Sequence, residues 1–284
     1  MPQHFTTIQA PSTNSKLVLS SLKKFEQRLD ANSPSVKLVL SGTEHYHIDG
    51  RHSALQPGRL LIVDSQSQVA LNIHARQPVT GLCLFPGKAL LNEVARAQTS
   101  APEHLLDTPL ESSNFALTQQ HTTQHEQHTG RFVAQHLPQL LAWAQGAPVA
   151  NMDAFYYGLA ECLVTDQQAL TGQLKRLPSI KKATREELLH RVATARMYAE
   201  ANYTRKLTLD ELAQVACLSK YHFTRTFQAV YRCSPYQYLL RLRLDKAQQL
   251  LGSGYSYQQA SDLVGFSDAN NLRKALKKHG CKRN

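Results

Sequence analysis

An internal repeat in the last part of the chain constrains its fold more than any other feature. Residues 208–211 (TLDE) have the pattern of a capping box, in which the first side chain accepts from the fourth amide and the fourth side chain returns to the cap amide. Residues 256–259 (SYQQ) repeat it. Eight residues after each cap stands a small or branched apolar residue, Ala216 or Val264. Such self-similarity indicates one supersecondary unit built twice.

Each copy continues through a short turn into a second helix. The turns are CLS at 217–219 and GFS at 265–267, and the serine that ends each turn predicts an N-cap. The following helix buries two apolar residues four positions apart, in FTRTF of the first copy and LRKAL of the second. The sequence therefore predicts two helix-turn-helix units.

A single helix is predicted between the copies, in SPYQYLLRLRLDKAQQLLGSG. Ser234 is its cap, Pro235 its first residue and Gly252 its stop. Its apolar residues recur at spacings of 4, 3 and 4 and predict a core stripe shared by both units: Leu240, Leu244, Ala247 and Leu251. A rod of about 17 residues spans roughly 26 Å. It can hold two helices at a separation that approaches the ~34 Å between successive major-groove faces.

The positive charge of the chain lies in the same region. Residues 1–180 contain 13 Lys and Arg and 13 Asp and Glu, whereas residues 181–284 contain 19 and 8 and so carry the whole net charge of +11. Lys and Arg side chains near phosphates release condensed counterions, so a neutral front and a basic back are typical of a chain whose back binds a polyanion. A solvated basic face would have the same composition, and the helix-turn-helix pattern favours DNA.

The first part of the chain has a different pattern of apolar residues. Turn signals at Asp49-Gly50 and Pro57-Gly58 separate five short apolar segments that we predict to be strands: VKLVLSG, EHYHIDG, LLIVD, VALNIHA and GLCLF. After Pro86 the pattern lengthens into helical segments, roughly 88–98, 112–145 and 152–176. We therefore expect a small β-barrel with a helical extension.

These patterns divide the chain into parts. We expect an α+β protein with a regulatory domain over 1–176, a linker over 177–186, and an all-α domain over 187–284 in which a linker helix joins two helix-turn-helix units.

Residues 185–280 resemble the DNA-binding domain of AraC/XylS transcription activators. The Leu-Ser turn before FTRTF, the Ser-Pro entry, RLRLDKAQQLL and VGFSD have that family's order and spacing. The resemblance implies that the second helices, about 219–231 and 268–279, enter the major groove and that RNA polymerase is a partner. The second copy departs from the family pattern at Asn271, Leu272 and Lys274. The front is loosely similar to the family's cupin-like domains, which sense a small-molecule effector or form a homodimer.

The polar positions of the two second helices are the candidates for contact with double-stranded DNA. On the first helix they are Lys220, Tyr221, His222, Thr224, Arg225 and Gln228. On the second they are Asp268, Ala269, Asn270, Asn271, Arg273 and Lys274, with Lys277 and Lys278 expected on phosphates. Arg225 fits a phosphate contact, an ion-pair anchor or a guanine reader, and an Asn amide can pair with adenine.

Two sets of histidines could in principle bind a metal. His45, His47 and His74 could meet inside a barrel, but the Glu and Gly that follow the pair in metal-binding cupins are missing. A second set would share one face if its segment is helical: His121, His125 and His128. No carboxylate stands between the first two as in zinc proteases, so we expect solvated faces and no metal or cofactor.

The absence of several sequence motifs narrows the functional classes and the cellular locations that we expect for the protein. The sequence has no nucleophile elbow, phosphate loop or dinucleotide fingerprint, so we expect no catalytic residues and no enzyme. Its five scattered cysteines, with no apolar stretch long enough for a membrane span and no signal peptide, favour the cytoplasm. Two alternatives stay open: a cupin enzyme fused to a DNA tether, and a DNA-bending protein without sequence choice.

Overall fold

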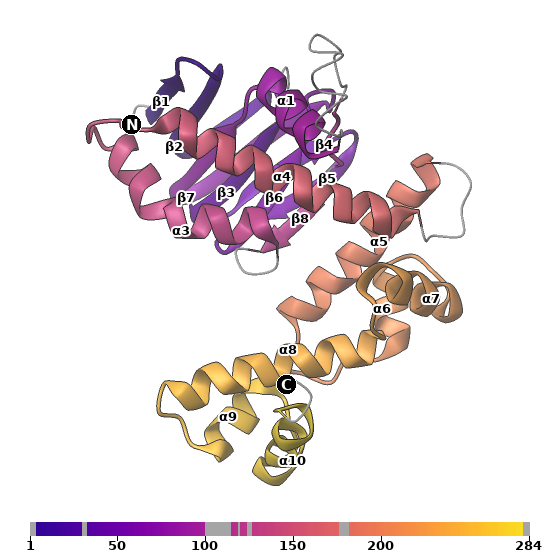
Figure 1. Cartoon of the computed structure of the whole chain (residues 1–284). Coiled ribbons are helices and arrows are strands. Elements are labelled where there is room, and N and C mark those ends of the chain that lie inside the picture. Colours follow the sequence, from indigo (N-terminus) through magenta and orange to yellow (C-terminus); the bar gives the residue numbers. More distant parts are fainter. Residues whose placement is uncertain are drawn as a thin grey trace. The chain divides into compact units, whose positions relative to one another are not determined.

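A computed structural model describes most of the chain, namely residues 4–29, 33–99, 115–118, 120–123, 127–175 and 182–280. The chain divides into two compact units, Met1–Leu170 and Thr171–Asn284. The first combines an antiparallel sheet with helices, and the described part of the second is helical (Figure 1). The predicted α+β class is therefore confirmed.

The N-terminal unit is built on a sheet whose strand pairings, in the described residues, are all antiparallel. The order is β1-β2-β7-β3-β6-β8, and the β4–β5 hairpin joins the sheet through the pairing of β4 with β7. The strands are β1 His4–Ala10, β2 Ser15–Leu29, β3 Ser35–Ser41, β4 Glu44–Ile48, β5 Arg51–Leu55, β6 Arg59–Val63, β7 Val69–Phe85 and β8 Gln120–Thr123.

The strand prediction is only partly confirmed. Strands β3, β4 and β6 coincide with predicted segments, whereas VALNIHA and GLCLF are two parts of the single strand β7. The exposed polar residues Arg76 and Gln77 in the middle of β7 have the sequence pattern of a loop between two strands. The strand nevertheless continues, and its backbone pairing with β2 resumes beyond them. Strands β1, β2, β5 and β8 were not predicted, because their residues are too polar or too irregular in alternation to mark a buried face.

The long strands β2 and β7 contribute buried residues to two different hydrophobic cores. Leu82 and Leu84 of β7 pack with the helices in one cluster, whereas Leu71 and Ile73 pack with Phe25 of β2 in a second cluster that strands alone enclose. The pairing of β2 with β7 shifts register midway, an irregularity of the kind that bends a sheet. A sheet that encloses its own core on one face and carries helices on the other agrees with the expected small barrel with a helical extension.

Three helices complete the described part of this unit: α1 Lys88–Thr99, α3 His128–Ala144 and α4 Met152–Leu174. Figure 1 shows α3 and α4 crossing one face of the sheet. The predicted helices at 88–98 and 152–176 are confirmed. The predicted helix over 112–145 is confirmed for His128–Ala144, which is α3, and wrong for Gln120–Thr123, which is β8 and pairs with β6. Asp166, which is buried, accepts from the amides of His128 at 3.2 Å and Thr129 at 2.8 Å and so marks where α3 begins.

The C-terminal unit contains the two predicted helix-turn-helix pairs, α6 with α7 and α9 with α10. Its helices are α5 Lys182–Ala201, α6 Leu209–Val215, α7 Lys220–Tyr231, α8 Pro235–Gly252, α9 Tyr257–Val264 and α10 Ala269–Gly280. The first residues of α5 fall within the segment 177–186 that the sequence suggests as a linker. Complete capping boxes start α8, at Ser234 and Gln237, and α9, at Ser256 and Gln259.

The start of α6 is tied to the preceding helix by a polar network. The Thr208 hydroxyl accepts from the Glu211 amide at 3.2 Å, as the repeat predicts. The Glu211 carboxylate binds the Arg205 guanidinium and accepts from the Tyr198 hydroxyl at 2.7 Å. Arg205, followed by Tyr198, lowers the pKa of Glu211 to about 2. Because Tyr198 belongs to α5, the Glu211 carboxylate links the first helix-turn-helix unit to the helix that precedes it.

The turns of the two helix-turn-helix units have the same backbone pattern and differ in where the positive-φ residue stands relative to the next helix. Cys217 and Gly265 have φ of 50° and 77°, and each is followed by an amide that bonds five residues back, Leu218 to Ala213 and Phe266 to Ser261. Ser219 then caps α7 as predicted. In the second unit the predicted cap at Ser267 is wrong, because the carboxylate of the next residue accepts from the Asn271 amide at 2.8 Å. Four residues separate the two helices in both units, but the second helix begins three residues after Cys217 and four residues after Gly265.

Gly265 is required by both its conformation and its neighbour. Besides its positive φ, a Cβ at this position would lie 2.2 Å from the backbone oxygen of Thr204. We expect Gly265→Ala to destabilise the C-terminal unit by about 2 kcal/mol or more, since strain and a clash with backbone add together. Gly252→Ala is the matched control, because a Cβ there meets no atom within 4 Å. Urea unfolding of both variants measures the difference, and equal midpoints would contradict the assignment.

The linker helix α8 supplies the core of the second unit. Leu244 and Ala247 are buried with Ala260, Val264 and Leu272, and Leu240 and Leu251 pack at the edge of the same cluster. The predicted stripe is confirmed, but the expectation that it is a core shared by both units is wrong for Leu244. The first helix-turn-helix unit has a separate aromatic core, in which the ring centroids of Phe227 and Tyr238 of α8 are 5.7 Å apart.

Candidate nucleic-acid interface

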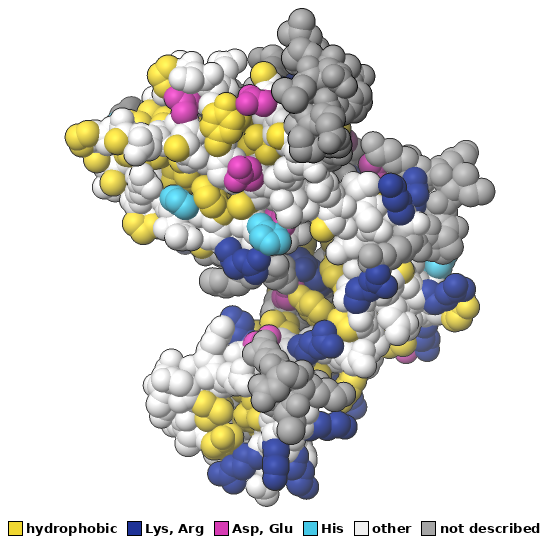
Figure 2. Space-filling view, viewed as in Figure 1, with side chains coloured by type: hydrophobic (Ala, Val, Ile, Leu, Met, Phe, Trp, Pro, Cys, Tyr) yellow, Lys and Arg dark blue, Asp and Glu magenta, His cyan; other side chains and the backbone are white. Residues whose placement is uncertain are grey.

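Basic side chains gather on the C-terminal unit. Figure 2 shows Lys and Arg side chains over its helices, whereas apolar and acidic side chains are prominent on the N-terminal unit in the same view. This distribution matches the partition of charge along the sequence, in which residues 181–284 carry the whole excess. It supplies the electrostatic part of an interface for a polyanion.

Helix α7 has one buried side and one polar side. Phe223 and Phe227 are fully buried, with ring centroids 5.5 Å apart. Thr224 is half-buried, and its hydroxyl donates to the carbonyl of Lys220 at 2.8 Å, which engages it within the helix. The other candidates of this helix are exposed: Lys220, Tyr221, His222, Arg225 and Gln228.

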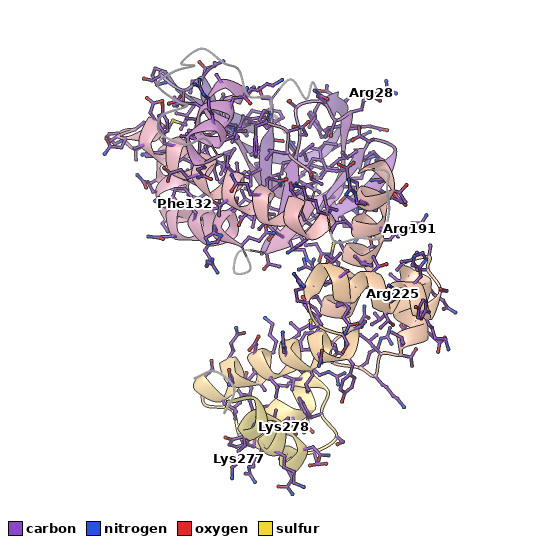
Figure 3. The ribbon with its side chains drawn as sticks, turned by 45° about the vertical axis from the view of Figure 1, so that its right-hand side comes forward. Arg28, Phe132, Arg191, Arg225, Lys277 and Lys278 are labelled. Atoms are coloured by element: carbon purple, nitrogen blue, oxygen red, sulfur yellow. The ribbon has the colours of Figure 1, made fainter. Side chains whose placement is uncertain are left out.

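Two of these exposed cations already have partners within the unit. The Lys220 amine lies 2.8 Å from the carboxylate of Asp210 in α6. Arg225 donates from Nη1 to the Tyr221 hydroxyl at 3.0 Å, and its guanidinium lies 5.6 Å from the centre of the same ring. Arg225, labelled in Figure 3, is thus held on the surface of α7 by a side chain one turn earlier.

The later start of α10 relative to its positive-φ residue changes which positions of α7 and α10 correspond. The turn residues Cys217 and Gly265 are 48 positions apart, but α10 begins 49 positions after α7. Counting from the helix starts, Arg225 corresponds to Lys274 and Thr224 corresponds to Arg273.

The polar side chains at the start of α10 are engaged in hydrogen bonds that cap the helix. Asn271 Nδ2 donates to Ser267 Oγ at 2.8 Å and to Asp268 Oδ2 at 2.7 Å. The Asn271 amide also lowers the pKa of Asp268. With both amide hydrogens engaged, Asn271 presents only its oxygen and cannot pair with adenine by donating and accepting together. Of the other candidates here, Ala269 is half-buried and Asn270 is exposed.

Farther along α10 lie four exposed cations: Arg273, Lys274, Lys277 and Lys278. The Arg273 guanidinium lies 4.7 Å from the ring centre of Tyr257, the first residue of α9. Lys277 and Lys278 project from the last turns of the helix (Figure 3). Tyr257 was not among the predicted site residues, because no local pattern connects it to an arginine 16 positions away on another helix.

The described histidines of the N-terminal unit do not converge inside its core. Alternation along β4 points Tyr46 inward and leaves His45 and His47 exposed, and His74 on β7 is exposed as well. His121 lies in β8 and not in a helix, while His125 lies outside the described residues. Within the described part of the chain, no three His, Cys, Asp or Glu side chains are placed to hold a metal ion.

A cavity of about 110 Å³ with mostly apolar walls reaches buried polar groups in the N-terminal unit. The buried Lys37 amine lies 3.4 Å from Cys83 Sγ and 5.4 Å from the ring centres of Tyr46 and Phe85. Glu44 accepts from the Tyr46 hydroxyl at 2.6 Å, and burial raises its pKa. Because an ammonium has three donors and a thiol is a weak acceptor, Lys37 can bind a further acceptor in the cavity. The sequence signal was a single lysine inside the apolar run VKLVLSG.

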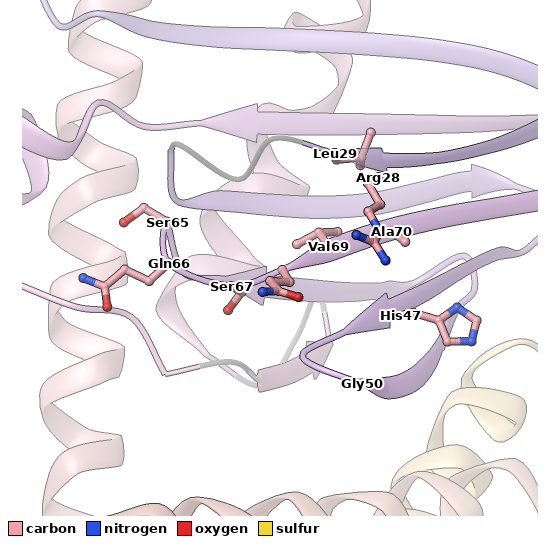
Figure 4. A pocket seen from close by; sticks show the side chains of 10 residues that line it. Arg28, Leu29, His47, Gly50, Ser65, Gln66, Ser67, Val69 and Ala70 are labelled. Atoms are coloured by element: carbon pink, nitrogen blue, oxygen red, sulfur yellow. The ribbon is translucent and has the colours of Figure 1, made fainter.

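A second, wider hollow of about 540 Å³ lies at the end of the sheet (Figure 4). Arg28 of β2 and His47 of β4 line it together with the turn Ser65–Gln68. Its walls are mainly polar, in contrast to the cavity at Lys37. Its size falls in the range of small-molecule sites.

None of the helices in the described ranges combines the length and the apolar character that crossing a bilayer demands.

Comparison with known proteins places the C-terminal helices in context. A family model described as a helix-turn-helix domain matches residues 212–280. The probable transcriptional regulator LumQ of Photobacterium leiognathi is 33% identical over 82 residues, 28% of this chain and 33% of that protein. The HTH-type transcriptional regulator GbdR of Pseudomonas aeruginosa is 35% identical over 81 residues, 28% of this chain and 22% of that protein. The chain thus aligns with no more than a third of either relative.

Among solved structures, a transcriptional regulator of Chromobacterium violaceum, described as having an AraC-type DNA-binding domain, is 28% identical. The match covers 33% of this chain and 84% of that one, with a TM-score of 0.31. The family match begins inside α6 and ends with α10, so it spans both helix-turn-helix pairs and the linker helix α8. The C-terminal unit therefore carries a helix-turn-helix domain.

Proposed function

We propose that the protein is a cytoplasmic transcription regulator that binds DNA sequence-specifically and reads two adjacent major-groove segments with α7 and α10. The observation that carries this proposal is the pair of helix-turn-helix units within the matched segment. Each unit ends in a capped helix with a buried apolar side and an exposed polar side. RNA polymerase and a second copy of the chain are the protein partners that the family resemblance implies.

The candidate residues divide into two roles. Lys277 and Lys278, at the far end of α10, neutralise phosphates. His222, on the exposed side of α7, contacts base edges, because the first turns of a reading helix lie deepest in the groove. The hydroxyl of Thr224 is engaged within the helix, so its methyl group is its means of contact with a base.

The double variant Lys277→Ala with Lys278→Ala tests the phosphate role. We expect affinity to fall equally for the operator and for random duplexes, and the slope of log affinity against log salt to shrink by about two units. Fluorescence anisotropy at several salt concentrations measures both quantities on one series of duplexes. A loss confined to the operator would contradict the assignment.

His222→Ala is the matched variant for base reading, because it leaves the net charge almost unchanged. We expect it to weaken operator binding by about 1 to 3 kcal/mol while random binding and the salt slope stay the same. Equal affinity of the native protein for operator and random duplexes would instead indicate an architectural DNA-bending protein.

We further propose that the N-terminal unit senses a small molecule in the cavity at Lys37. The buried amine and the apolar walls favour a small molecule with an apolar body and a carboxylate. Short-chain monocarboxylates should raise the melting temperature of the native protein, and their uncharged amides should not. Lys37→Met, which keeps the volume and removes the charge, should abolish the shift; a shift that persists would place the ligand elsewhere. A metal-dependent cupin enzyme is the alternative, and the three histidines that it would require, His45, His47 and His74, are exposed.

A further inference from the structure

We infer that Arg273, oriented by the ring of Tyr257, determines the base preference of the second helix-turn-helix unit by reading a guanine. This inference rests on the proposed function, because it assigns the reader within one of the two groove-reading helices. It concerns a pair of residues on different helices, α10 and α9.

The other polar positions at the start of α10 are less suited to this task. Asn271 has both amide hydrogens engaged with the cap, and Asp268 uses its carboxylate to hold the backbone of the same turn. Ala269 has no polar group. Asn270 is exposed but has no described contact that fixes its direction. Arg273 is the first cation of the helix whose orientation is set by a neighbour.

The contact with Tyr257 suits an arginine that reads a base. A guanidinium that stacks on a ring keeps its N–H groups pointing outward in its own plane, so the fork that matches guanine O6 and N7 stays available. The guanidinium carbon of Arg273 lies 4.7 Å from the ring centre, close enough for a cation–π interaction. In the first unit, Arg225 lies farther from its ring, at 5.6 Å, and spends one N–H on the Tyr221 hydroxyl.

The two units therefore hold an arginine at different helical positions. Arg225 is the sixth residue of α7, whereas Arg273 is the fifth residue of α10. The residue that corresponds to Arg225 in the second unit is Lys274, which lacks the planar fork. The residue that corresponds to Arg273 in the first unit is Thr224, whose hydroxyl is engaged within the helix. The second unit compensates for its lysine by an arginine one residue earlier, supported from α9.

The test uses the full chain and an operator obtained by selection of bound genomic fragments. Dissociation constants are measured at one salt concentration for the operator, for its single-base variants and for random duplexes. Arg273→Ala should lose about 5- to 100-fold in operator affinity, with the preference for guanine lost at one position of one half-site. Tyr257→Leu should weaken the same preference by about two- to fivefold, and Tyr257→Phe, which keeps the ring, should retain it.

Two control variants distinguish a loss of Arg273 orientation from a folding defect and from a loss of charge. Tyr255→Leu changes a neighbouring exposed tyrosine and should leave base preference unchanged. Arg273→Lys keeps the charge and should still lose the guanine preference, because a lysine cannot form the bidentate contact. All variants should unfold at the temperature of the native protein.

Several outcomes would overturn the inference. A uniform loss for Arg273→Ala on operator and random duplexes, with a smaller salt slope, would assign this residue to a phosphate. Retained preference in Tyr257→Leu would remove the orienting role of the ring. If the native protein itself showed no preference between operator and random DNA, the proposed function would fail first, and that result is visible before any variant is made.

Discussion

Residues 181–284, expressed alone, should bind double-stranded DNA with an affinity that falls roughly a thousandfold or more between about 50 and 200 mM salt. This segment carries the entire net charge of +11, and its helices α5 to α10 lie within one compact unit. Each Lys or Arg that neutralises a phosphate releases counterions, so several such contacts make the salt dependence steep. Electrophoretic mobility shifts at stepped salt concentrations measure the slope.

Residues 1–180 are the natural control for this experiment. They contain equal numbers of basic and acidic residues and a complete sheet with its own cores. They should show no binding to the same duplexes under the same conditions. Comparable affinity of the two halves would show that the partition of charge does not locate the interface.

Leu244→Asp should unfold the second helix-turn-helix unit and leave the first one folded. Leu244 is buried among Ala247, Ala260, Val264 and Leu272, so a carboxylate at this position would enter the core of the second unit without a partner. The expected loss of stability is about 3 kcal/mol or more. Hydrogen exchange should show protection lost in α9 and α10 and kept in α6 and α7.

Gln248→Asp supplies the matched control, because it adds the same charge to an exposed position of the same helix. It should retain operator affinity and melting temperature within experimental scatter. DNA binding by Leu244→Asp should drop to the weaker level of a single unit. Simultaneous loss of protection in both units would restore the idea of one shared core, which the packing of Phe227 against Tyr238 argues against.

The C-terminal unit was predictable because its signals are local. A cap such as Ser256, its capping partner Gln259 and the apolar residue eight positions after the cap all lie within one or two turns of helix. The same logic failed at Ser267, since a serine and the aspartate after it are both good caps and only the backbone chooses between them. A difference of one residue in a turn has no signature in helical periodicity.

The features that the sequence concealed depend on distant parts of the chain. Strand β2 is positioned by its pairing with β7, whose partner residues lie 40 to 69 positions farther along the chain, and its own residues alternate too weakly to predict a strand. Lys37 stands alone in an apolar run of the sequence, and the register of β3 with β7 places it beside Cys83 at one cavity. Contacts of this kind are set by tertiary packing, which local propensity does not encode.

The extra residue between Gly265 and the start of α10 sets a rule for exchanging parts between the two halves of the domain. A chimaera that aligns the copies by their turn residues, Cys217 with Gly265, would transplant each helix about 100° out of phase, because one residue of an α-helix subtends that angle. Every side chain meant for the groove would then face a flank, and an apolar residue meant for the core would face water. Grafts joined at the cap, Ser219 onto Asp268, keep the phase. The two copies are thus interchangeable as helices but not as numbered sequences.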